Sequence, residues 1–130
     1  FGKPMLVSTG AMTAGQLMTL YAWRGTPSIT FLHCVSAYPT QMSDLNLRVM
    51  DGDLGFSDHT ANVLTGALAV MRGAHTIEVH LRLPDTPADN PDYGHSLTPD
   101  ALREYIANVR TAEAALGYGR KRLLDCEPRW

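Results

Sequence analysis

His59 and His80 are the side chains whose type and placement point most directly to chemistry. Each follows or ends a predicted strand, and the two strands are consecutive along the chain. Neutral imidazole is the commonest protein ligand for metal ions, and Asp58 and Glu78 add carboxylates beside the two rings. A hydrogen-bonded structural role is the alternative for any histidine at a strand end. Few protein ligands would leave coordination positions open for water and substrate, which a catalytic metal requires.

Ser8, Ser36 and Ser57 each lie at or just after the end of a predicted strand. A small hydroxyl beside exposed backbone amides can donate to a phosphate or a carboxylate. Small polar residues also end strands and begin turns for purely structural reasons. Together with a candidate metal pair, the three serines favour an anionic substrate.

Structural roles are the simplest explanation for the remaining histidines and for Cys34. His33 lies inside a predicted strand, where a hydrogen-bonded core position is expected. We expect His75, at the start of a strand, and His95, in a long polar loop, to face solvent. Cys34 has no activating neighbour in sequence, so a buried thiol is predicted.

The elements that must position these side chains alternate between strand and helix. Short apolar or β-branched runs predict strands at residues 5–8, 28–34, 54–56 and 75–81, and helical spacing predicts helices near 13–23, 62–72 and 101–116. Gly25-Thr26-Pro27 breaks the first helix, Asp58 or Thr60 could cap the second, and Thr98 with Pro99 predicts the start of the third. This order indicates parallel βα units, whose ligands bind at the carboxyl ends of the strands.

Composition excludes several functional classes. The chain has 130 residues, 45% hydrophobic and 18% charged, with a net charge of −2, as expected of one packed domain or part of one. No run of Lys or Arg resembles a nucleic-acid footprint, and no apolar stretch suggests a membrane span or a signal peptide. Two distant cysteines predict neither a disulfide framework nor a zinc knuckle, so a reducing cytoplasm is the expected location.

Five segments of the chain resemble the sialic acid synthase family, and they occur in that family's order across nearly the whole sequence. They are Lys3-Pro4-Met5-Leu6-Val7-Ser8-Thr9-Gly10, Leu32-His33-Cys34-Val35-Ser36-Ala37-Tyr38-Pro39-Thr40, Gly55-Phe56-Ser57-Asp58-His59-Thr60, Ile77-Glu78-Val79-His80 and Ser96-Leu97-Thr98-Pro99. The resemblance implies a (β/α)₈ barrel enzyme that condenses phosphoenolpyruvate with an N-acylated amino sugar, such as N-acetylmannosamine or its 6-phosphate, and releases phosphate. It also implies a divalent Mn²⁺ or Mg²⁺ ion.

The resemblance assigns roles to individual residues of this chain. It implies His59 and His80 as metal ligands, Ser8, Ser36 and Ser57 as phosphoenolpyruvate contacts, and Tyr38 and Asp92 as sugar contacts. The chain departs from the family pattern around Asp92. The family usually reads Gly-Pro-Asp followed by a hydrophobic residue before the Ser-Leu pair, whereas this chain has Asn90-Pro91-Asp92-Tyr93-Gly94-His95-Ser96.

The length of the chain sets the expected domain organisation. A complete (β/α)₈ barrel needs roughly 250 residues, so residues 1–130 are expected to form a single partial barrel domain, its second half, with about four strands. The amino-terminal half-barrel, which supplies the family's acidic general base, and its antifreeze-like domain have no counterpart here. The resemblance implies a homodimer for the full-length enzyme. The alternatives are a non-catalytic half-barrel that binds or assembles, and another metal-dependent aldolase.

Overall fold

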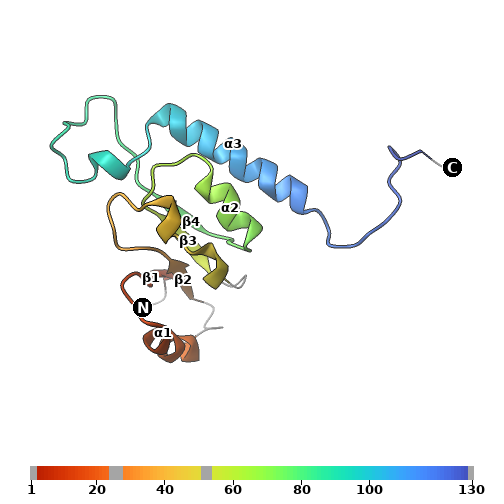
Figure 1. The fold of residues 1–130 in the computed structure, drawn as a ribbon, viewed down its shortest axis with the longest axis horizontal. Coiled ribbons are helices and arrows are strands. Elements are labelled where there is room, and N and C mark those ends of the chain that lie inside the picture. The colour runs from red at the N-terminus through yellow and green to blue at the C-terminus, as the bar shows by residue number, and fades with distance from the viewer. Residues whose placement is uncertain (1–2, 24–27, 51–53, 129–130) are drawn as a thin grey trace.

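The computed structural model describes residues 3–23, 28–50 and 54–128 (Figure 1). The strands are β1 (Met5–Ser8), β2 (Ile29–His33), β3 (Gly55–Asp58) and β4 (Ile77–Val79), and the helices are α1 (Ala14–Leu20), α2 (Thr65–Met71) and α3 (Pro99–Leu116). The predicted alternation of strand and helix is therefore confirmed. The break predicted at Gly25-Thr26-Pro27 lies outside the described residues.

The four strands form one parallel sheet in the order β1-β2-β3-β4. Ser8 pairs with Leu32, His33 with Phe56, and Ser57 with Glu78. Because the strands are parallel and in chain order, their carboxyl ends all lie along the same edge. That edge carries the candidate residues which follow each strand.

Alternating residues of β3 face opposite sides of the sheet. Phe56 packs with Phe31 of β2 and Ala69 of α2 in a buried core cluster that also contains Leu54 and Met50. Side chains in a strand alternate between faces, so residues 57 and 59 lie on the face away from this core. Helices α2 and α3 lie side by side on the core face (Figure 1).

Asp58 shares the helix-facing side of β3 and is buried, with 3% of its surface exposed. Its carboxylate accepts hydrogen bonds from the Thr60 backbone N–H at 2.8 Å, the Thr60 hydroxyl at 2.7 Å, the Tyr105 hydroxyl at 2.9 Å and the Thr65 hydroxyl. The prediction that Asp58 or Thr60 caps α2 was wrong, because the N-cap is Leu64 and has no side-chain cap. Asp58 instead links β3 to α2 and α3.

Helix α3 begins as predicted. The Thr98 side chain accepts a hydrogen bond from the Ala101 N–H at 3.2 Å, and Pro99 occupies the first turn. Gly66 of α2 allows the close approach of α3, since a methyl group there would overlap the Tyr105 ring. No helix in the described residues is long and apolar enough to cross a bilayer.

The connection from β2 to β3 contains two short 3₁₀ turns, Met42–Asp44 and Leu47–Val49, and no α-helix in its described part. Arg72, at the end of α2, donates to the carbonyls of Leu47, Arg48 and Met50. These bonds hold the connection against the helix layer. Residues 51–53 of this connection lie outside the described residues.

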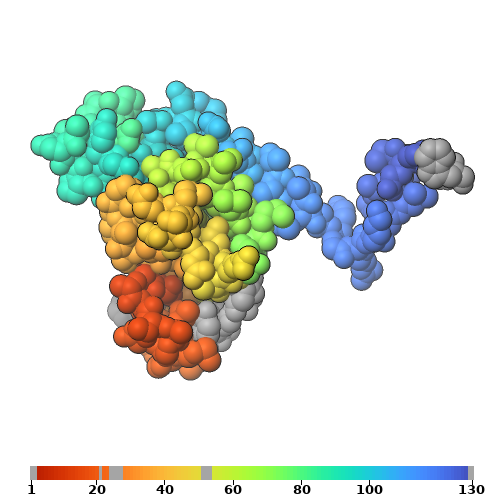
Figure 2. Space-filling model, viewed as in Figure 1, coloured from red at the N-terminus to blue at the C-terminus, as the bar shows by residue number. Residues whose placement is uncertain are grey.

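The segment after α3 extends away from the rest of the molecule (Figures 1 and 2). Gly117 ends the helix with a φ of 58°, a conformation that suits glycine. Residues 117–126 are exposed along their whole length. His59, His80 and Asp92 lie at the opposite end of α3, near the loop that connects it to β4.

Candidate metal and substrate site

The structure brings His59 and His80 together at the carboxyl edge of β3 and β4, with 5.5 Å between their ring centroids. His59 is 5% exposed, and its Nδ1 lies 2.8 Å from the carbonyl oxygen of Val35. A carbonyl oxygen only accepts, so Nδ1 carries a proton, and in a neutral ring Nε2 then keeps its lone pair. A backbone contact of this kind is how proteins orient an imidazole for metal binding.

Ser57 lies between His59 and Glu78. Its Oγ is 2.7 Å from Glu78 Oε1 and 3.2 Å from His59 Nε2. A hydroxyl has one proton to donate, and donation to the carboxylate leaves the lone pair of a neutral His59 without a donor. The Nε2 of His59 is then available to a cation or to another donor.

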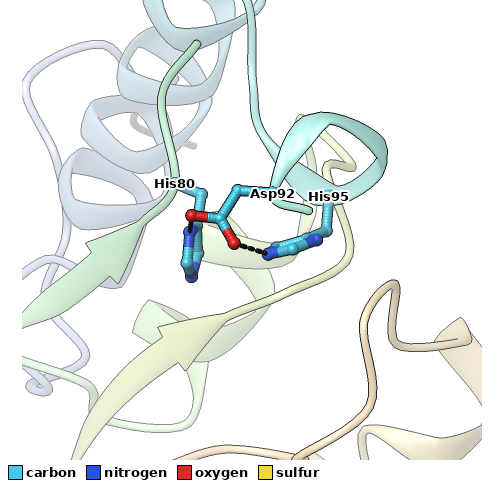
Figure 3. Close-up of side chains that lie close together, drawn as sticks. All are labelled: His80, Asp92 and His95. Carbon is cyan, nitrogen blue, oxygen red and sulfur yellow. Dashed lines mark ion pairs between the residues drawn. The ribbon is translucent and has the colours of Figure 1, made fainter. Parts of the chain in front are cut away.

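His80, Asp92 and His95 form a compact group beside this pair. In Figure 3 the Asp92 carboxylate lies between the two imidazoles: Oδ2 is 3.6 Å from His80 Nδ1 and Oδ1 is 3.4 Å from His95 Nε2. One ligand atom from each of the three residues lies within 4.8 Å of the other two. The His80 and His95 ring centroids are 4.5 Å apart.

The prediction that His95 faces solvent was wrong. Its exposed fraction is only 3%, and its Nε2 is a buried nitrogen that makes no hydrogen bond. Burial lowers the pKa of His95, and the nearby His80 lowers it further. A buried neutral imidazole with a free ring nitrogen is a competent metal ligand.

Backbone pairing explains why His95 is buried. Leu97 forms a parallel bridge with Leu81, in which its N–H donates to the His80 carbonyl at 2.8 Å and its carbonyl accepts from the Arg82 N–H at 2.9 Å. This pairing draws the end of the loop alongside the end of β4. His95 precedes the paired residue by two positions, so it comes to lie against His80.

Three further hydrogen bonds fix the same loop. The Arg82 guanidinium donates to the carbonyls of Tyr93 at 2.6 Å and Ser96 at 2.9 Å, and the Ser96 hydroxyl donates to the Asp92 carbonyl at 2.6 Å. Asp92 is the N-cap of a 3₁₀ turn over Tyr93–His95. Residues three apart lie on the same side of a 3₁₀ helix, so Asp92 and His95 face the same way. The Asp-x-x-His spacing indicates that the two side chains face the same way, but it does not indicate that His95 is buried against His80.

Tyr38 covers the histidine cluster from the loop after β2. Its ring centroid is 4.4 Å from that of His59 and 4.9 Å from that of His95, while the side chain stays 56% exposed. The adjacent Tyr38–Pro39 peptide bond is cis. Thr40 joins this loop to β3, because its N–H donates to the His59 carbonyl at 2.9 Å.

Ser8 is the last residue of β1 and Ser36 follows β2 along the same edge, and both residues are exposed. Gly10 packs closely on Ser36, since a methyl group at Gly10 would overlap the Ser36 hydroxyl. The structural interpretations of His33, His75 and Cys34 agree with the structure. His33 Nε2 lies 2.8 Å from the Leu45 carbonyl, His75 is exposed, and the Cys34 thiol is buried.

Comparisons with known proteins match this chain to synthases. The NeuB family model matches residues 1–121. The chain is 36% identical to human N-acetylneuraminate-9-phosphate synthase, over 97% of this chain and 38% of the human protein. It is also 36% identical to the pseudaminic acid synthase of Campylobacter jejuni, over 91% of this chain and 37% of that protein. It therefore spans well under half the length of these relatives.

A solved structure supports the same assignment. The N-acetylneuraminic acid (sialic acid) synthetase of Leptospira borgpetersenii superposes with a TM-score of 0.78 at 27% identity, over 97% of this chain and 45% of that chain. The predicted fold, parallel βα units that form part of a (β/α)₈ barrel, is thereby confirmed. The match covers the four strands and the loop that carries Asp92 and His95. On this evidence the chain belongs to the NeuB family.

Proposed function

We propose that this chain forms the metal-binding side of the active site of a nonulosonic acid synthase, which condenses phosphoenolpyruvate with an N-acylated amino sugar and releases phosphate. The observation that carries the proposal is the convergence of His59 and His80 at the carboxyl edge of the sheet, in a chain of the NeuB family. Ligands of parallel barrels bind at that edge.

The proposed cofactor is Mn²⁺ or Mg²⁺, with His59 and His80 as ligands. The residues fit a divalent ion, because Val35 holds His59 with its Nε2 lone pair free and because His95 offers a second buried nitrogen without a partner. A bound ion would supply Lewis acidity at the carbonyl group of the sugar. The side chains themselves orient the ion and leave positions open for the substrate.

Ser8, Ser36 and Ser57 are the proposed phosphoenolpyruvate contacts. Hydroxyl donors suit an anionic substrate, but the Ser57 hydroxyl has Glu78 as its acceptor at 2.7 Å in this state. It cannot donate to Glu78 and to the substrate at once. Binding of phosphoenolpyruvate therefore requires the Ser57 hydroxyl to turn from Glu78 toward the ligand.

Tyr38 and Asp92 are the proposed sugar contacts. Tyr38 is more than half exposed beside His59, and Asp92 is 61% exposed at the mouth of the cluster. Both can exchange hydrogen bonds with hydroxyl or N-acyl groups. The two named relatives make different products, N-acetylneuraminate 9-phosphate and pseudaminic acid. The sugar substrate is therefore proposed only as a class, the N-acylated amino sugars.

Metal binding gives the first test. Isothermal titration with Mn²⁺ should detect a site in the wild-type chain that His59→Ala and His80→Ala each weaken by about tenfold or more. His75→Ala is the matched control, since that histidine is exposed. Equal Mn²⁺ affinity in all four proteins would overturn the proposed site.

Turnover gives the second test. Residues 1–121 would replace the matching segment of Campylobacter jejuni pseudaminic acid synthase, and phosphate release from phosphoenolpyruvate would be measured with N-acylated amino sugars and Mn²⁺. Phosphate release that depends on both His59 and His80 supports the synthase. A folded chimaera that releases no phosphate with any acceptor of this class would refute it.

A further inference from the structure

His95 is the one described residue whose buried side-chain nitrogen has no hydrogen-bond partner. Burying a polar atom without a partner costs about 1–3 kcal/mol, so such atoms in a folded protein need an explanation. Asp92 Oδ1 is 3.4 Å from this nitrogen, which is within ion-pair distance of a protonated ring, but the two atoms do not form a hydrogen bond. A neutral His95 therefore keeps a buried nitrogen without a hydrogen-bond partner.

A cation would satisfy this nitrogen together with its neighbours. Two atoms that bind one metal ion at about 2.1 Å are roughly 3.0–3.4 Å apart at octahedral or tetrahedral angles. The separations here are 3.4 Å from His95 Nε2 to Asp92 Oδ1 and 3.6 Å from His80 Nδ1 to Asp92 Oδ2. The two distances end on different oxygens of the carboxylate, which lies between the rings in Figure 3, and the three ligand atoms lie within 4.8 Å of one another. The three side chains would move inward to bind one ion.

The backbone already holds the three residues in this arrangement. Leu97 pairs with the His80 carbonyl, Arg82 binds two carbonyls of the loop, and the 3₁₀ turn aligns Asp92 with His95. A loop fixed at this many points loses little entropy when it binds a ligand. This loop is also the stretch in which the chain departs from the family pattern.

We propose that His95 is a third imidazole ligand of the metal site, acting with His80 and Asp92, and that it shifts the preference of the site toward Co²⁺, Ni²⁺ and Zn²⁺. Imidazole suits these ions, whereas Mg²⁺ and Mn²⁺ favour oxygen ligands. Asp92 has two carboxylate oxygens, so one can bind the ion while the other accepts from a sugar hydroxyl. This inference rests on the proposed function for the presence of a metal at His80.

Titrations with several metals test the preference. The Zn²⁺ and Co²⁺ affinities should fall about tenfold or more in His95→Ala, while the Mn²⁺ affinity falls by a smaller factor, and the visible spectrum of the Co²⁺-loaded protein should change. His95→Gln, which fills the same space without an imidazole nitrogen, should behave like His95→Ala, and His75→Ala like the wild type. Wild-type Zn²⁺ and Co²⁺ affinities in both His95 variants would overturn the inference.

A measurement on the unaltered chain removes any dependence on how the variants fold. Zn²⁺ is added to ¹⁵N-histidine-labelled protein, and the ring-nitrogen resonances are followed by NMR. Those of His80 and His95 should both shift, while those of His75 stay in place. Shifts at His59 and His80 without one at His95 would refute this inference and leave the proposed function standing. No shift at either His59 or His80 would refute the proposed function itself.

Discussion

Tyr105→Phe isolates one hydrogen bond between α3 and β3. The Tyr105 hydroxyl donates to Asp58 Oδ2 at 2.9 Å, and the two residues are 2% and 3% exposed. Phenylalanine keeps the ring that packs on Gly66 and removes only the donor. The Asp58 carboxylate then retains its bonds from Thr60 and Thr65 and loses the one from α3.

The expected cost follows from the charge of the acceptor. Hydrogen bonds to charged groups contribute about 1.5–3 kcal/mol, and the lost donor leaves a buried oxygen partly unsatisfied. With a urea m value of about 2 kcal/mol per molar, a loss of about 2 kcal/mol lowers the unfolding midpoint by about 1 M. The assay is urea unfolding followed by circular dichroism at pH 7. Tyr118→Phe is the control, since Tyr118 is 88% exposed, and its midpoint should not change.

The same hydroxyl makes stability depend on alkaline pH. Burial, and then the Asp58 carboxylate, raise the pKa of Tyr105 above its ordinary value. Because the unfolded chain loses the proton at about pH 10, the contribution of Tyr105 is complete below that pH and declines above it. The difference between wild type and Tyr105→Phe should therefore shrink by about 1.4 kcal/mol between pH 9 and pH 11. A difference below about 0.5 kcal/mol at pH 7, or one that does not vary with pH, would refute this reasoning.

Two further perturbations test the packing and the loop. Gly66→Ala should lower the free energy of unfolding by about 1–3 kcal/mol, because the new methyl group overlaps the Tyr105 ring. Gly15→Ala, whose added methyl group meets nothing within 4 Å, should not destabilise; equal effects of the two would contradict the packing. Arg82→Met should speed amide exchange at Leu97 by about tenfold, since two hydrogen bonds to the loop are lost. An unchanged exchange rate would mean that the backbone pairing alone holds the loop.

Local sequence signals predicted the elements well. Thr98 followed by Pro99 predicted the start of α3, because an N-cap hydroxyl and a proline at the first helical position act within a few residues. Apolar runs likewise predicted the four parallel strands, although β4 is shorter than its predicted range 75–81. Signals of this kind depend only on neighbours in the chain.

The environments of His95 and Asp58 depend on contacts with residues far away in the sequence, which no local sequence pattern predicts. His95 lies in a loop rich in Pro and Asp, which predicted an exposed position, whereas the pairing of Leu97 with Leu81 buries it. Asp58 resembled a helix cap because it precedes α2, yet its bond to Tyr105 spans 47 positions of the sequence. In both cases a partner far along the chain decides the environment. Strand-end positions predicted that His59 and His80 lie close together, but no signal within the loop predicted that His95 lies beside them.

The alternation along β3 also bears on how such a protein can evolve. Phe56 and Asp58 belong to the helix-facing layer, and Ser57 and His59 belong to the candidate site. Replacing residues 57 or 59 can therefore alter the candidate site without changing the side chains of β3 that face the helices. Inserting or deleting a single residue within β3 would exchange the two sets and place imidazole and hydroxyl groups against the helices. In this strand, substitutions can change ligand specificity, whereas insertions and deletions would disrupt both faces at once.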